Sequence, residues 1–272
     1  MTATADAPAS PNRATPTFPA DARYVLRDTV SVAKRNLLRI IRTPQLLAIS
    51  TLQPALLLVL FRYVLGGAIH VPGIDYVDYV VPAVFLEAVL IGGMTTSVGL
   101  AQDARSGIID RWRSLPMARS AVLAGRTLAD LSRSLTALII MVGLGLAVGF
   151  RFHASPGAAL AGFGVILYFG YACSWAYATV GLATRDPETA QVASLLPFFV
   201  LLFASNAIVP IDVMPGWLQA FARNQPLSIN VAAARSLMEG GQTSTYVWQS
   251  LVWSTGILVV FFATSLRLYR RA

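Results

Sequence analysis

The chain has 272 residues, of which 56% are hydrophobic and only 12% are charged, and its mean hydropathy is +0.62. Soluble domains are about a quarter charged, so this composition excludes an ordinary cytosolic enzyme, a disordered chain and a nucleic-acid-binding protein. The net charge of +8 is then a clue to orientation in a membrane, because Lys and Arg collect on the cytoplasmic side.

Residues 1–20 are rich in Ala, Pro, Thr and Ser. No apolar stretch follows a charged start, so we expect no signal peptide and predict that residues 1–20 form a disordered tail. Cysteine and histidine are scarce: a single Cys173 leaves no disulfide or cysteine cluster, and His70 and His153 do not make a zinc site by themselves. We therefore expect no catalytic residue, no metal site and no cofactor bound by this chain.

Six apolar runs follow. A helix needs about 20 apolar residues to cross the hydrocarbon of a bilayer, and the sequence places such spans at about residues 44–65, 79–102, 128–150, 157–184, 189–211 and 244–266. The fold class is thus an all-α membrane protein with six transmembrane helices, in a transmembrane domain covering residues 44–272.

The basic residues predict how these spans are oriented. Seventeen of the 21 Lys and Arg residues flank the spans on one side, and the other side has only Arg62, Arg151, Arg223 and Arg235. This bias places both termini in the cytoplasm. Because Arg far outnumbers the single Lys34 and Ala and Gly are abundant, we expect a high-GC bacterial genome and the bacterial cytoplasmic membrane.

Residues 21–43 are predicted to form an amphipathic interfacial helix before the first span. Apolar residues such as Val30 and Leu37 share one face, and the opposite face carries Arg35, Arg39 and Arg42. Such a helix lies in the membrane plane, and Pro44 ends it. It is either an anchor for anionic lipid or a lever that touches a cytoplasmic partner.

The loop between the second and third spans contains a short helical pattern. Its apolar positions are Ile108, Ile109, Trp112 and Leu115, its charged positions are Asp110, Arg111 and Arg113, and Gly107 and Pro116 bound it. One or two helical turns are not stable alone in water, so this element packs on something. That surface is either the chain's own interfacial helix or a groove on a separate subunit.

Two segments resemble one family. The run Gly107-Ile-Ile-Asp-Arg-Trp-Arg-Ser-Leu-Pro-Met-Ala-Arg-Ser-Ala-Val-Leu-Ala-Gly-Arg126 is similar to the cytoplasmic loop of ABC-2 type export permeases, especially the actinobacterial daunorubicin-resistance type, which usually has Phe at position 112. Ser205-Asn-Ala-Ile-Val-Pro210, Met214-Pro-Gly-Trp-Leu218, Asn224-Gln-Pro-Leu227 and Arg235 resemble the outer-face segment of that family. The resemblance covers about residues 24–271.

The resemblance implies the membrane half of an ATP-driven exporter. Two permease chains, identical or related, would pair above two copies of a separate ATPase, which would hold ATP and Mg; this chain has no GxxxxGK[ST] motif. Contacts with the ATPase would come from a first coupling helix comprising Gly107, Ile108, Asp110, Arg111, Trp112, Arg113, Leu115 and Pro116, and a second contact at Arg185, Asp186 and Glu188. The cargo would be a hydrophobic or amphipathic drug, lipid or glycolipid.

The transport pathway has weaker signals. Glu87 is the one ionisable residue that we assign to the interior of a span, where it is costly and usually faces protein or water. It could meet a cationic substrate, pair with Arg62 or stay protonated. The segment Met214–Arg223 is predicted to be a short outer re-entrant helix, either a lid that merely packs or an exit gate. The possible gate residues are Asn206, Pro210, Met214, Pro215 and Trp217.

Two other functions are compatible with such a composition. An intramembrane lipid-modifying enzyme would need polar residues converging at membrane depth, and a secondary transporter usually shows an internal repeat and several intramembrane ionisable residues. We see no clear sign of either pattern. The export permease is therefore the favoured hypothesis.

Overall fold

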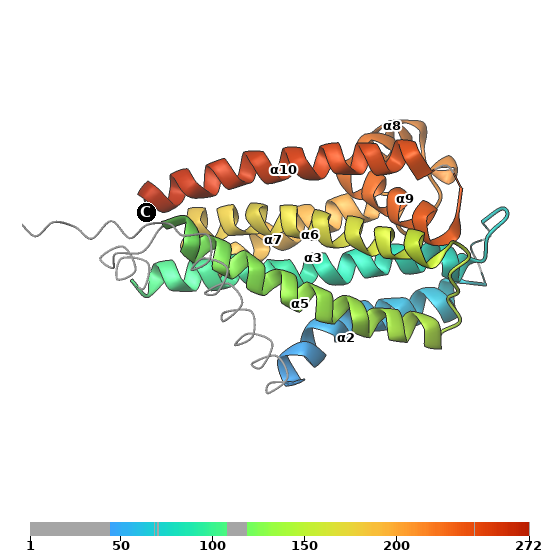
Figure 1. Cartoon of the computed structure of the whole chain (residues 1–272), viewed down its shortest axis with the longest axis horizontal. Helices are drawn as coiled ribbons and strands as arrows, with labels where there is room; N and C mark the ends of the chain where they lie inside the picture. The colour runs from blue at the N-terminus through green and yellow to red at the C-terminus, as the bar shows by residue number, and fades with distance from the viewer. Residues whose placement is uncertain (1–43, 68, 70, 108–118, 242, 272) are drawn as a thin grey trace, which may run out of the picture.

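The computed structural model describes residues 44–271 apart from 68, 70, 108–118 and 242. In this part of the chain the regular structure is helical and no strand is present (Figure 1). The prediction of an all-α protein is confirmed.

The helices follow one another with short connections. They are α2 (Pro44–Leu60) with the π-helix η1 (Phe61–Leu65), α3 (Tyr76–Arg105), α5 (Arg119–Ala147), α6 (Pro156–Thr184), α7 (Pro187–Phe203), the 3₁₀ helix η2 (Ile211–Val213), α8 (Gly216–Asn224), α9 (Pro226–Glu239) and α10 (Thr243–Arg271). The predicted short helix at 214–223 corresponds closely to α8. The sequence analysis did not predict α9.

Four helices are long and apolar enough to cross a membrane: α3, the part of α5 from Asp130, α6 and α10. Helices α2 and α7 have 17 residues each. At 1.5 Å per residue each is about 25 Å long, slightly less than the roughly 30 Å of a bilayer's hydrocarbon. The protein is therefore an integral membrane protein by composition and length, and the number of six spans remains a prediction.

Helix α3 is the centre of the bundle. It contacts α2, α5, α6, α7 and α9, and 94% of its most apolar stretch is buried. Helix α6 approaches it closely because of two glycines: a Cβ atom at Gly170 would overlap the Val89 side chain, and one at Gly181 would overlap the Ser97 carbonyl. Small residues allow this close packing of helix backbones within a membrane.

Helix α10 lies on the outside of the same bundle. It packs on α6 and α9, but only 11% of its most apolar stretch is buried. Large apolar side chains such as Val252, Val259 and Phe262 are exposed there. Lipid is the natural solvent for such a surface.

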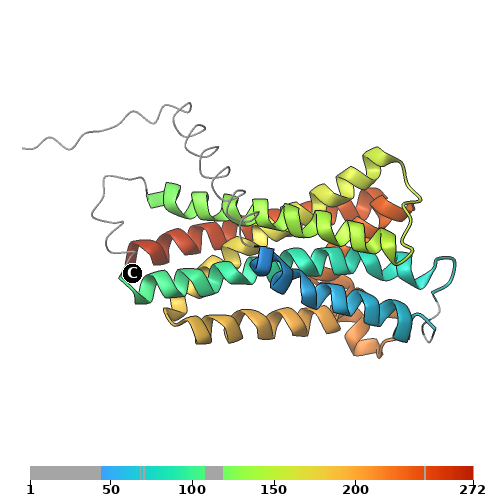
Figure 2. The same cartoon turned by 90° about the horizontal axis from the view of Figure 1, so that it is seen from below.

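All the long helices run roughly along one axis, so the bundle has two ends (Figures 1 and 2). The end of α3, the α6–α7 turn and the end of α10 lie at one end. The start of α3, α8 and α9 lie at the other. We call these the first end and the second end.

Candidate functional site

At the first end, α3 is tied to the α6–α7 turn. Arg105, the last residue of α3, forms an exposed ion pair with Asp186, with 3.3 Å between Nη1 and Oδ1. Asp186 also caps α7, because its Oδ2 accepts hydrogen bonds from the Thr189 amide at 2.9 Å and hydroxyl at 2.8 Å. These bonds and the charge of Arg105 lower the pKa of Asp186.

The backbone shapes the same turn. Arg185 has φ of 54° and ends α6 with a hydrogen bond from its N–H to the Gly181 carbonyl. Gly107 has φ of +69° just beyond α3, a conformation that favours glycine. Because Arg105 and Asp186 touch, the structure brings Gly107 and the turn Arg185–Glu188 to the same end of the molecule.

Most other predicted contacts with an ATPase fall outside the described residues. These are Ile108, Asp110, Arg111, Trp112, Arg113, Leu115 and Pro116 of the loop and Arg35, Arg39 and Arg42 of the interfacial helix. Their roles stay predictions.

At the second end, a polar network joins α3 to the segment after α7. We define the Arg235 network as Tyr79, Asn206 and Arg235. The Asn206 carbonyl accepts from the Tyr79 hydroxyl at 2.8 Å and from Arg235 Nη2 at 3.0 Å. Arg235 Nε donates to the Tyr79 carbonyl at 2.8 Å, and the guanidinium lies 3.5 Å above the Tyr79 ring. A cation over an aromatic face adds electrostatic attraction.

Neighbouring bonds fix the rest of this segment. The Gln225 side-chain amide donates to the carbonyls of Leu201 and Ala204, at 3.0 and 2.6 Å, and so satisfies the last carbonyls of α7. The Asn206 amide donates to Ser228 Oγ at 3.2 Å. The path from α7 to α9 is thus held by specific hydrogen bonds.

The remaining predicted gate residues lie on or before α8. Pro210 precedes η2, and Pro215 precedes α8. The Met214 carbonyl accepts from Gln219 Nε2 at 2.8 Å. Trp217 is 77% exposed, so its side chain does not seal the described part of the bundle; it faces lipid or another molecule.

Glu87 lies within α3 and is only 2% exposed. Its Oε1 finds no hydrogen-bond partner within the described residues. No ion pair between Glu87 and Arg62 occurs in that part of the chain. A lone carboxyl group in such surroundings is costly when charged.

A second ionisable group inside the bundle escaped the sequence analysis. Asp130 and Arg133 of α5 form an ion pair with 2.7 Å between their atoms. Asp130 also accepts from the Thr96 hydroxyl, and Arg133 donates to the Gly92 carbonyl at 2.5 Å. Both residues lie in the predicted span 128–150, so the view that Glu87 alone is ionisable within the spans was wrong. The i, i+3 spacing of opposite charges was the available signal.

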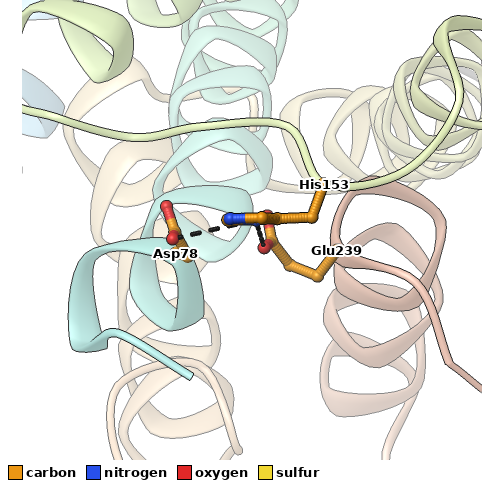
Figure 3. A group of neighbouring side chains, drawn as sticks. All are labelled: Asp78, His153 and Glu239. Atoms are coloured by element: carbon orange, nitrogen blue, oxygen red, sulfur yellow. Dashed lines mark hydrogen bonds and ion pairs between the residues drawn. The ribbon is translucent and has the colours of Figure 1, made fainter. Parts of the chain in front are cut away.

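A third group of titratable side chains lies at the second end, where Asp78, His153 and Glu239 point toward one another (Figure 3). His153 Nδ1 is 2.6 Å from Glu239 Oε2 and 3.9 Å from Asp78 Oδ2. Burial raises the pKa of Glu239 to about 7, and the hydrogen bond to Glu239 raises the pKa of His153. The group borders a cavity of about 940 Å³ that opens toward the link between η1 and α3.

The fold and these two ends define a class of protein: a helical integral membrane protein with polar contacts concentrated where the bundle meets water. The model of the family described as "ABC-2 type transporter" matches residues 27–238, and the chain belongs to this family. It is thus a transport component rather than an enzyme.

Curated relatives agree with this assignment. The chain is 36% identical over 223 residues to the daunorubicin resistance ABC transporter permease protein DrrB1 of Streptomyces coeruleorubidus, covering 80% of this chain and 77% of the relative. It is 32% identical over 220 residues to the probable doxorubicin resistance ABC transporter permease protein DrrC of Mycobacterium tuberculosis, covering 80% and 79%. It is also 32% identical to the doxorubicin resistance ABC transporter permease protein DrrB of that species, over 66% of this chain and 62% of the relative.

Proposed function

We propose that this chain is the permease subunit of an ATP-driven exporter in a bacterial cytoplasmic membrane. It pairs with a second permease chain, identical or related, and two copies of a separate ATPase dock at its first end. The cargo is a hydrophobic or amphipathic compound such as an anthracycline drug, a lipid or a glycolipid. The proposal is supported by family membership and by the daunorubicin and doxorubicin resistance named for the relatives.

The observation that carries the mechanism is the course of α3. This helix begins beside the Arg235 network and ends at Arg105, which contacts the turn predicted to meet the ATPase. Thirty residues of helix are about 45 Å long. A displacement of the first end therefore reaches the second end through one buried helix that is closely packed on α6.

ATP supplies the direction of the movement. A ligand shifts a two-state equilibrium only by its differential affinity for the two states. In the proposed cycle, ATP binding closes the ATPase dimer, the loop helix around 107–116 and the turn Arg185–Glu188 shift as rigid plugs, and the permeases tilt. Both termini and this first end face the cytoplasm.

The second end would then be the exit gate. Asn206 and Met214 hold the connection between α7 and α8 through backbone carbonyls, and Glu87 lies farther along α3 toward the first end. We propose that Glu87 contributes to the pathway for cationic compounds. The variant Glu87→Gln would then lose transport of cationic drugs but keep ATP turnover; unchanged export of every compound would remove Glu87 from the pathway.

The decisive experiment reconstitutes the permease with its ATPase in proteoliposomes. Drug-stimulated ATP turnover and ATP-dependent accumulation of doxorubicin are expected. Charge reversal at Asp110 or Arg111 should abolish both and leave the permease folded by size-exclusion chromatography. The matched control reverses Arg223, an exposed arginine paired with Asp212 at the opposite end. Normal coupling in the Asp110 and Arg111 variants would overturn the coupling role.

A further inference from the structure

The group formed by Asp78, His153 and Glu239 is not used by the mechanism above. Asp78 lies in the first turn of α3, His153 in the link between α5 and α6, and Glu239 at the end of α9. The nitrogen and oxygen atoms that each offers all lie within 4.8 Å of one another. Three segments distant in sequence thus direct three ligand atoms at one point (Figure 3).

The backbone holds these side chains in place. The amides of His153 and Ala154 both donate to the Met238 carbonyl, at 3.1 and 3.0 Å, which fixes the link against α9. The Arg151 amide donates to Asp78 Oδ1 at 3.1 Å, so Asp78 Oδ2 is left facing His153. Bonds of this kind orient the ligands of a metal ion in many proteins.

Glu239 gives an independent indication that a ligand is missing. Its side chain is only 7% exposed, and its Oε1 is buried with no hydrogen-bond partner among the described residues. Its carboxylate points toward His153 and Asp78 (Figure 3). A buried carboxylate normally has its acceptors satisfied by donors or by a metal ion.

We propose that Asp78, His153 and Glu239 bind a divalent transition-metal ion of the zinc class. One imidazole and two carboxylates form a donor set that suits Zn²⁺ and its neighbours, and catalytic-type zinc sites use three protein ligands with water in the open position. The adjacent cavity of about 940 Å³ provides access and room for that water. A small rotation must separate Nδ1 from Oε2, since two zinc ligands lie roughly 3.3 Å apart in tetrahedral geometry.

Binding would join α3, the α5–α6 link and α9 at the second end. An ion held by all three segments stabilises the arrangement in which they meet, in proportion to its affinity for that arrangement. The inference does not depend on the proposed cargo or on the ATPase.

The test uses tag-free, chelator-treated full-length protein in lipid nanodiscs. Calorimetric titration with Zn²⁺ should give one ion per chain, and Co²⁺ should produce visible d–d absorption that Zn²⁺ abolishes. Glu239→Gln and His153→Ala should each weaken Zn²⁺ binding by at least about tenfold. Two controls should keep wild-type affinity: His70→Ala, which changes the only other histidine, and Asp75→Asn, which removes a different carboxylate of the same cavity.

The result has clear alternatives. Absence of stoichiometric binding to the wild-type chain overturns the proposal, as does binding that His153→Ala leaves unchanged or that His70→Ala abolishes. His153 is 55% exposed in its side chain, so its substitution should not impair folding. If Glu239→Gln fails to fold by size-exclusion chromatography, His153→Ala therefore decides the question alone.

Discussion

The two ends of α3 are held in different ways. At the second end, the Arg235 guanidinium reaches two backbone carbonyls and an aromatic ring inside the protein. At the first end, Arg105 makes one exposed ion pair with Asp186. Buried bonds fix a geometry because leaving them unmade is costly, whereas exposed ion pairs contribute little to stability. The second end therefore has the character of a fixed frame, and the first end can exchange its partner for another protein.

The strongest test of the fixed frame is Arg235→Ala. It leaves the carbonyls of Tyr79 and Asn206 without their donor, and we expect the free energy of unfolding to fall by about 3 kcal/mol. Reversible denaturant titration in micelles, followed by tryptophan fluorescence, measures this change. The control is Arg223→Ala on the neighbouring α8, which is exposed and should have little effect. Equal losses in the two variants would contradict the distinction between a buried and an exposed arginine.

A second test addresses the helix that connects the two ends. Gly181→Val places side-chain atoms against the Ser97 backbone of α3, and overpacking of this kind costs about 1–3 kcal/mol. Gly164→Val in the same helix α6 meets open space and serves as the matched control. In the same unfolding assay, Gly181→Val should be clearly less stable than Gly164→Val. The idea of a closely packed α3–α6 pair fails if the two variants unfold together.

A smaller effect is expected from Asp186, which caps α7. Asp186→Ala removes the acceptor for both Thr189 donors and should lower the melting temperature less than Gly181→Val does, while Asp186→Asn retains most of the cap. Because the pKa of Asp186 is lowered below its ordinary 3.8, its contribution is fully present above the unfolded pKa. It is lost as the pH falls through the folded pKa. The difference between wild type and Asp186→Ala should therefore persist near pH 7 and shrink in strong acid.

The sequence predicted the apolar helices well because their signal is local. Long runs without charge occur at α3, α6 and α10, and the pattern requires no knowledge of neighbours. Helix α9 was missed because Asn230, Arg235 and Glu239 make it too polar for a span, and its hydrogen bonds to other segments are not visible in the sequence. Searching for charge-free runs likewise removed Asp130 and Arg133 from the third span before their pairing could be considered.

The candidate sites were predictable to different degrees. The turn Arg185–Glu188 was named from a family resemblance, and the structure places it beside the end of α3. The metal-ligand group could not be found from spacing, because His153 and Glu239 are 86 residues apart and Asp78 belongs to yet another segment. Two histidines in a sequence do not indicate zinc when the carboxylate ligands come from distant helices. The loop at 108–116 remains the part of the site known only as a pattern.

The smallest expected change in stability comes from Arg105→Glu, and it separates the two ends most sharply. The exposed pair with Asp186 is screened by water and salt, so the melting temperature of the isolated permease should not change measurably. In proteoliposomes with the ATPase, however, the reversed charge would repel Asp186 and displace the turn predicted to receive the ATPase movement. ATP-dependent doxorubicin accumulation should therefore fall by about tenfold or more, a change in coupling free energy of roughly 1.4 kcal/mol. Arg223→Glu makes the same charge change at the second end and should leave both melting and transport near wild type. Loss of transport in both variants would mean that surface charge at either end matters equally, and the first end would have no special role in coupling.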